Sequence, residues 1–230
     1  MKMRDKKLSY SHRYAMVVYH VLTHYSVKAG IKKFGTVGAT AVSDELQQFY
    51  AKDTFTPVKA KTLSRKQKKR VLRLLMFLKK KRDGKIKGRA CVDGRKQRDV
   101  YAKEDVSSPT VSIEVVLLTS VIDALEERDV LVTDIPGAYL TTNMDEEVHV
   151  ILEEKLAEMM VLIAPEVYRT YIITSKNGKP TLYIKLKKAL YRYLRSALLF
   201  WKKLSGGIVE DRFVLNPYDA CVANKEINGS

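Results

Sequence analysis

The chain has few cysteines and no long apolar run. Among its 230 residues are two cysteines, Cys91 and Cys221, which stand far apart. Two such cysteines are too few for a disulfide framework or a zinc site, so we expect both to be buried small apolar residues in a reducing compartment. No run approaches the roughly 20 apolar residues that cross a bilayer, and residues 1–7 do not lead into a signal-peptide core. The sequence therefore predicts an intracellular globular protein with no membrane partner.

Sequence motifs of several common enzyme classes are also missing. The chain has no glycine-rich phosphate loop, no Gly-x-Ser-x-Gly elbow and no pattern of a Cys/His nucleophile. His20 and His24 stand four residues apart, but the Glu of a zinc protease does not lie between them and no third ligand is near in sequence. The histidines therefore do not predict a zinc site.

Negative charge is scarce in the first part of the chain. The formal net charge is +16, and between Arg65 and Arg98 sixteen basic residues are opposed only by Asp83 and Asp93. A surface this positive attracts polyanions, because each neutralised phosphate releases condensed counterions. The alternatives are a solvated helix face and a nuclear-import run over 65–70. We expect nucleic-acid contact through Arg65, Lys66, Lys68, Lys69, Arg70, Lys85, Arg95, Lys96 and Arg98.

Helices are predicted where apolar residues recur every three or four positions. A helix is expected over 42–51, with Ser43 as its N-cap and acidic residues in its first turn. Ser64 and Gln67 have the spacing of a capping box, and the apolar stripe that follows predicts a helix running to about Lys81.

Three further helices are predicted from the same periodicity. One has mixed apolar spacing and covers 13–25. Another is capped by Ser112, buries one apolar face and ends near Arg128. The last keeps helical spacing over 186–204, and Gly206 is a natural residue to follow its end.

Strands are predicted by alternation and by turn residues. Asp83–Gly84 is a strong hairpin signal, and alternation over 86–92 predicts a strand whose cations point the same way. A central strand is expected over 130–135. Two more strands are predicted, over 147–152 and 181–186. This order of elements predicts an α+β fold rather than repeating βαβ units.

Three segments together carry a resemblance to a known family. Residues 132–140 read Val-Thr-Asp-Ile-Pro-Gly-Ala-Tyr-Leu, and they lie between Lys-Gly-Arg at 87–89 and Leu-Tyr-Arg-Tyr-Leu-Arg-Ser at 190–196. In this order and spacing, the segments resemble the reverse transcriptase of copia-type LTR retrotransposons. Residues 41–46 look like the start of that domain, and residues 216–222 look like one of its later blocks.

The resemblance implies a right-hand polymerase. The expected architecture is the fingers and part of the palm, with an incomplete palm sheet and flanking helices. Residues 1–40 would form an N-terminal extension, and residues 41–230 a partial reverse transcriptase domain. Within that domain the fingers would cover about 41–128 and the partial palm about 129–230.

The resemblance also assigns roles to residues. Asp134 would be the catalytic carboxylate and a metal ligand, and Ile135 would offer its carbonyl to the second of two Mg²⁺ ions. Nucleotide-binding roles would fall to Lys87, Arg89, Gly137, Ala138, Tyr139, Tyr191 and Arg192. Arg195 and Ser196 would contact nucleic acid. Arg192 stands where the family has Gly, so a left-handed backbone there would cost stability.

One part of the family pattern is missing. The resemblance leads us to expect two adjacent aspartates soon after residue 225, and the chain has no Asp-Asp pair. We therefore expect an incomplete polymerase that is inactive alone. Two alternatives stay open, a nucleic-acid-binding module without catalysis and a decayed element fragment.

The family also implies partners and a location. These partners are an RNA template, a DNA primer, deoxynucleoside triphosphates, and the integrase and RNase H parts of a larger polyprotein. The expected location is a cytoplasmic particle or the nucleus.

Overall fold

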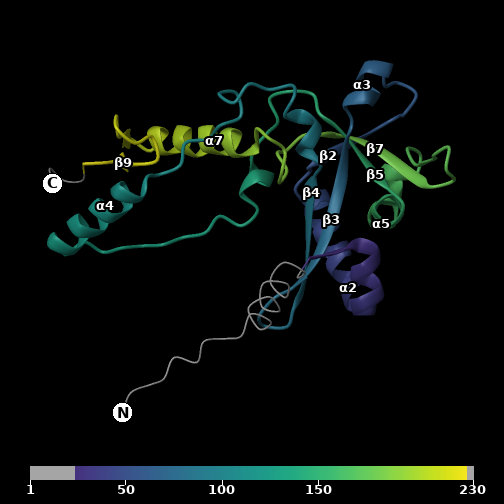
Figure 1. Cartoon of the computed structure of the whole chain (residues 1–230), viewed down its shortest axis with the longest axis horizontal. Helices are drawn as coiled ribbons and strands as arrows, with labels where there is room; N and C mark the ends of the chain where they lie inside the picture. Colours follow the sequence, from purple (N-terminus) through teal and green to yellow (C-terminus); the bar gives the residue numbers. More distant parts are fainter. Residues whose placement is uncertain (1–23, 227–230) are drawn as a thin grey trace, which may run out of the picture.

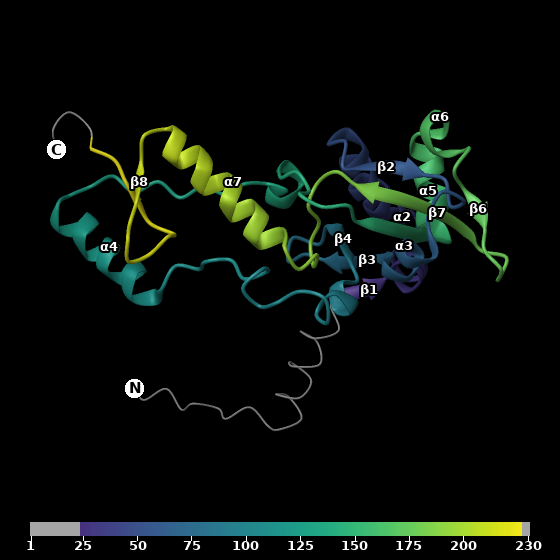
Figure 2. The ribbon, with the colours of Figure 1, turned by 90° about the horizontal axis from the view of Figure 1, so that it is seen from above.

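The computed structural model describes residues 24–226, which form an α+β fold. A mixed sheet with its packed helices occupies one end of the molecule, and helices α4 (Ile113–Leu125) and α7 (Ser196–Glu210) lie toward the other (Figures 1 and 2). No helix within the described residues is long and apolar enough to cross a membrane. The predicted α+β class is confirmed, whereas the polymerase architecture stays a prediction.

Within the described residues, the main sheet has seven strands. Strand β3 lies beside both β1 and β4, which run antiparallel to it, and its first residues pair in parallel with β5. Strand β7 pairs antiparallel with β5, β2 and β6. The strands are β1 (His24–Ser26), β2 (Phe55–Val58), β3 (Leu72–Lys80), β4 (Ile86–Val92), β5 (His149–Glu153), β6 (Ile173–Thr174) and β7 (Pro180–Leu186).

The core lies between this sheet and two helices, α2 (Val27–Ala51) and α5 (Lys155–Ile163). Val42, Leu46 and Phe49 of α2 are buried with apolar side chains of β3, β5 and β7. Two short helices complete this region, α3 (Arg65–Arg70) and α6 (Pro165–Tyr168). Burial of the core favours the fold by about 25 cal/mol for each Å² of apolar surface removed from water.

The predicted helix that runs to Lys81 is wrong beyond its first turns. The capping box between Ser64 and Gln67 is present, but α3 ends at Arg70. From Leu72 onward every second side chain is buried, which is the pattern of a strand. The apolar run fits both periods, and pairing with β4 along Leu74–Lys80 selects the strand.

The hairpin that follows was predicted correctly. Asp83 accepts a hydrogen bond from the Lys85 N–H, and Gly84 takes a positive φ of 84° in the turn. Strand β4 covers the predicted 86–92. The predictions for β5 and β7 are also confirmed to within two residues at their ends.

Helix α2 is longer than predicted. It begins at Val27 after the N-cap Ser26, so Ser43 lies inside the helix and does not cap it. Gly35, with φ 59° and ψ −135°, interrupts it with a kink. The helix predicted over 13–25 lies outside the described residues except for its last two, and those belong to β1.

The predicted buried face of α4 is not buried. Ser112 caps this helix as expected, but none of its residues is buried, and Leu125 is 79% exposed. The predicted central strand over 130–135 is also wrong. That segment belongs to no strand within the described residues, and Leu131 is 91% exposed. Apolar alternation gives a strand only where a neighbouring strand can pair with it.

Helix α7 starts later than the periodicity indicates. Residues 187–195 form a bridge and turns, so the predicted helix over 186–204 is wrong in its first half. Gly206 lies inside α7 and does not follow its end. The short strands β8 (Val214–Leu215) and β9 (Ala223–Asn224) pair beyond it. Cys91 is buried as predicted, but Cys221 is exposed, which contradicts the prediction for that residue.

Close packing at Gly94 generates a test of the fold. This residue opens the 3₁₀ helix η1 (Gly94–Gln97), and an added Cβ would lie 2.2 Å from the Arg192 carbonyl oxygen. We expect Gly94→Ala to lower the free energy of unfolding by about 1–3 kcal/mol, because the backbone must move. Urea denaturation measures the change. Gly206→Ala is the control, since it has open space inside α7 and Ala favours the helix.

Candidate functional site

Residues that are far apart in the sequence meet in one cleft of about 610 Å³. We call it the β4 cleft. Its walls come from α2, β3, β4, the segment around 134–140 and the turn at 191–192. Nine residues carried predicted metal or nucleotide roles, and all except Ala138 line it. The eight are Lys87, Arg89, Asp134, Ile135, Gly137, Tyr139, Tyr191 and Arg192.

One wall of the β4 cleft is cationic. Lys87 and Arg89 are both exposed, and they alternate along β4 with buried Gly88 and Ala90. Lys85, predicted to join them, precedes the strand in the turn and does not line the cleft. Two cations two residues apart on a strand can contact neighbouring oxygens of one anionic group.

Glu45 also lines this cleft, although it was not among the predicted site residues. Its Oε1 accepts a hydrogen bond of 3.0 Å from the Ala90 N–H. Burial raises the pKa of Glu45, although that hydrogen bond and the charges of Lys87 and Arg89 oppose the rise. This hydrogen bond therefore links α2 to β4, the strand that carries Lys87 and Arg89.

Another part of the cleft lining is the turn that follows Asp134. Gly137 takes a left-handed φ of 64° and leads into the 3₁₀ helix η2 (Ala138–Thr141). The Tyr139 and Tyr191 rings meet in a T-shaped arrangement, with 4.9 Å between centroids, and Tyr139 meets Phe200 in the same way. These contacts hold Tyr139 at the cleft. Asp134 is exposed.

Arg192 adopts the left-handed backbone that Gly favours, with φ 65°. For a residue with a Cβ this costs about 1–2 kcal/mol. Its guanidinium carbon lies 5.6 Å from the centroid of the Phe77 ring, which is the geometry of a cation–π contact. Burial raises the pKa of the nearby Cys91 thiol, and Arg192 opposes that rise. Arg192 is thus a third cation at the cleft.

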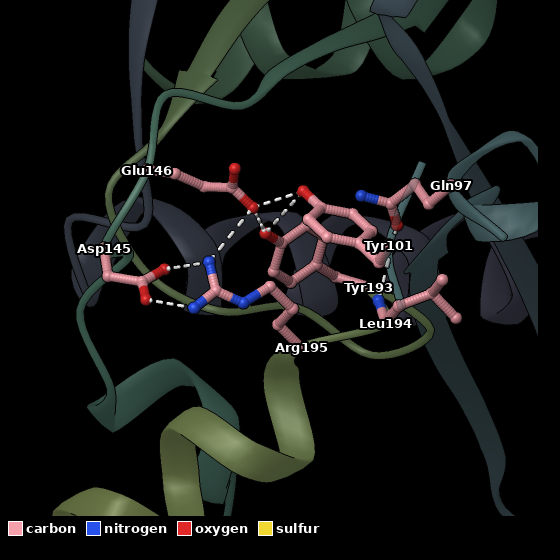
Figure 3. A network of polar contacts seen from close by, with 7 residues as sticks. All are labelled: Gln97, Tyr101, Asp145, Glu146, Tyr193, Leu194 and Arg195. Carbon is pink, nitrogen blue, oxygen red and sulfur yellow. Dashed lines mark hydrogen bonds and ion pairs between the residues drawn. The ribbon is translucent and has the colours of Figure 1, made fainter. Parts of the chain in front are cut away.

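A polar network holds the turn that contains Arg192, through Tyr193 and Arg195 (Figure 3). The Glu146 carboxylate accepts hydrogen bonds from the hydroxyls of Tyr101 and Tyr193 and lies 3.4 Å from the Arg195 guanidinium. Arg195 also donates two hydrogen bonds to Asp145, at 3.0 and 2.6 Å. The turn is therefore tied to the segment before β5 and to the segment after η1.

The network stabilises the ionised form of Glu146. Burial alone would raise its pKa, but the hydrogen bonds from both tyrosines and the charge of Arg195 outweigh burial, so the pKa lies below its usual value. Burial and the hydrogen bond to Glu146 raise the pKa of Tyr193. Both effects favour a carboxylate that accepts from neutral tyrosines.

The predicted nucleic-acid residues occupy three kinds of position. The five basic residues of α3 are exposed, as are Lys96 and Arg98. Arg95 is exposed but paired with Asp93 at 2.6 Å. Arg195 is engaged in the network, and Ser196 is 2% exposed and donates to the Leu190 carbonyl. The structure thus places Ser196 away from any surface that nucleic acid could reach.

The residues present do not fit a two-ion Mg²⁺ site. Such a site needs several hard oxygen ligands about two metal ions roughly 4 Å apart. Within residues 24–226, no group of three or more His, Cys, Asp or Glu side chains could hold a metal ion. Asp134 and the Ile135 carbonyl are therefore insufficient by themselves.

Comparison with known proteins adds no assignment. No protein-family model, no curated protein and no solved structure matches this chain.

The ionised Glu146 generates a pH prediction. We expect Glu146→Gln to lower the free energy of unfolding by about 1–3 kcal/mol at pH 7, because the amide replaces a charged acceptor with a weaker one. A carboxyl group whose folded pKa is depressed stabilises the folded state above its unfolded pKa of about 4.3, and that contribution is lost as pH falls through the folded pKa. The difference between wild type and variant should therefore shrink below about pH 4.

Urea unfolding across this pH range checks the prediction. Glu104→Gln is the matched control, because it removes an exposed carboxylate outside the network. A Glu146→Gln difference that stays constant down to pH 3 would contradict ionisation of Glu146 as the source of the stabilisation.

Proposed function

We propose that this chain is the fingers and part of the palm of a copia-type reverse transcriptase. In this proposal it binds a deoxynucleoside triphosphate in the β4 cleft and holds an RNA template and DNA primer on adjacent basic surface. The observation that carries the proposal is the convergence of Lys87, Asp134 and Tyr191 with their neighbours at one cleft. These residues were assigned from three separate sequence segments, and local sequence does not bring them together.

The chemistry of the β4 cleft suits a triphosphate. Lys87, Arg89 and Arg192 supply three cations, and an Arg guanidinium can bind two phosphate oxygens at once. The turn at Gly137 presents backbone at the same cleft, where amides can bind phosphate oxygens. By the resemblance, Tyr139 would lie under the incoming sugar and exclude a 2′ hydroxyl.

A binding module without catalysis is the second candidate function. It is favoured by the absence of adjacent aspartates from the sequence. Both candidates require nucleotide and nucleic-acid binding and differ in turnover. In either case we expect the location and the polyprotein partners of the family, a cytoplasmic particle or the nucleus with integrase and RNase H.

Charge reversal in the β4 cleft tests nucleotide binding. We expect Lys87→Glu with Arg89→Glu to weaken binding of Mg²⁺-dATP at least tenfold, because each charge-assisted hydrogen bond contributes about 1.5–3 kcal/mol. Isothermal titration calorimetry measures the affinity. The control is Lys61→Glu with Lys176→Glu, which makes the same charge change at exposed positions outside the cleft. Equal weakening in both variants would assign the effect to net charge.

Primer extension separates the two candidate functions. We expect the 230-residue chain to show no templated extension on RNA with Mg²⁺ or Mn²⁺, because Asp134 alone cannot hold two cations at the required separation. Clear extension by the purified chain would refute this. In a chimera that adds a copia-type segment with two adjacent aspartates after Ser230, we expect extension to appear. Asp134→Asn should then abolish extension and leave template binding nearly intact.

A further inference from the structure

A second cleft, of about 470 Å³, lies between α3, η1 and the start of β5. We call it the α3 cleft. Lys69 and Arg70 line it from the last turn of α3, and Lys96 lines it from η1. Tyr101, Glu146 and Glu147 also contribute to its walls. The cleft therefore contains both charge signs, and what it binds depends on which charges are already paired.

The carboxylates of the α3 cleft have partners within the protein. Glu146 accepts from Tyr101 and Tyr193 and pairs with Arg195. Glu147 accepts a 2.8 Å hydrogen bond from the Gln67 side chain, and Lys185 lies 3.7 Å from its second oxygen. Each of these carboxylates thus has a cationic side chain within 4 Å, which offsets part of its negative charge in the cleft.

The three cations of the α3 cleft are in a different situation. Across residues 24–226, no ion pair joins Lys69, Arg70 or Lys96 to an acidic side chain, and all three are exposed. Their positions are nevertheless defined. The capping box and the Gln67–Glu147 bond hold α3, and Gln97 accepts from the Leu194 N–H to hold η1. Cationic side chains carried by an ordered backbone favour binding of an anionic ligand, because the backbone need not be ordered when the ligand binds.

The α3 cleft also offers an aromatic ring. Tyr101 is half-buried, and its hydroxyl is held by Glu146, so the ring is already oriented before a ligand arrives. Because the ring is already oriented, stacking a base on it requires little further ordering of the protein. Any of the four bases can stack in this way. The volume suits a drug-sized ligand, which is the scale of one or two nucleotides. The bases of a duplex are stacked on their neighbours, so only a single strand can place a base on Tyr101.

We infer that the α3 cleft binds single-stranded nucleic acid, with Lys69, Arg70 and Lys96 on the phosphodiester backbone and one base on Tyr101. The inference rests on the proposed function and extends it, because it identifies the surface on which the single-stranded template would bind. Tyr191 and Arg192 line the β4 cleft, whereas the next residue, Tyr193, donates a hydrogen bond to Glu146 of the α3 cleft. A nucleic-acid strand bound in the α3 cleft would therefore be separated from the β4 cleft by the protein turn at 191–195.

Fluorescence anisotropy with a labelled single-stranded RNA of about 12 nucleotides tests the inference on the full chain. We expect Lys69→Glu with Lys96→Glu to weaken binding at least tenfold and to reduce the slope of log affinity against log salt by about 1.4, or roughly 0.7 for each lost phosphate contact. The control is again Lys61→Glu with Lys176→Glu, which has the same net charge. Equal affinities and slopes in the two variants would overturn the inference.

Two further measurements test the occupant. Tyr101→Leu should weaken RNA binding roughly fivefold to a hundredfold, whereas Tyr101→Phe, which keeps the ring, should retain most of the affinity. Inorganic polyphosphate should compete poorly at equal phosphate concentration. If polyphosphate or duplex RNA competes as well as the single strand, the cleft is a general polyanion site and the inference is wrong.

Mg²⁺-dATP titration separates this inference from the proposed function. The variant with Lys69→Glu and Lys96→Glu should bind Mg²⁺-dATP as the wild type does, because both residues lie outside the β4 cleft. Loss of RNA binding with intact nucleotide binding supports the inference. Failure of wild-type nucleotide binding, with RNA binding and its dependence on Lys69 and Lys96 intact, would instead refute the proposed function of the β4 cleft.

Discussion

The Glu146 carboxylate holds the turn at 191–195 through two of its residues, Tyr193 and Arg195. Arg192 has a left-handed backbone that costs about 1–2 kcal/mol, so the turn persists only if its neighbours are held. Tyr193 and Arg195 both interact with Glu146, and hydrogen bonds to a charged group contribute about 1.5–3 kcal/mol each. These interactions are large enough to offset the strain, and they place Tyr191 and Arg192 at the β4 cleft.

Local signals in the sequence predicted part of the fold. The capping box at Ser64, the turn at Asp83–Gly84 and the strand over 86–92 depend on neighbouring residues, so the chain itself specifies them. Leu72–Lys80 could not be assigned in this way, because Leu74 and Leu78 fit a helical stripe and an alternating strand equally well. Pairing with β4 resolves this run, and the periodicity of the run itself contains no information about that partner.

The residues of the candidate site also fall into two groups, those that a local motif predicts and those that only tertiary contacts reveal. Lys87, Asp134 and Tyr191 were found because each lies in a short contiguous motif of the resemblance. The resemblance assigns no role to Glu45 or Glu146, and their roles follow from partners 45 and 47 residues away in sequence. A single sequence shows that a carboxylate exists, but its effect on a site depends on tertiary contacts that the sequence does not state.

The two walls of the β4 cleft differ in how firmly the fold holds them. Lys87 and Arg89 stand on a strand paired with β3, and Gly137 begins a 3₁₀ helix whose Tyr139 is packed between two rings. Asp134 instead follows a segment outside any described strand, where Val132 is 88% exposed. Binding of a triphosphate needs the first group of contacts, whereas metal-dependent transfer needs a carboxylate fixed to within a fraction of an ångström. The cationic wall is therefore held more firmly than the carboxylate, which suits the proposed nucleotide binding better than the proposed turnover.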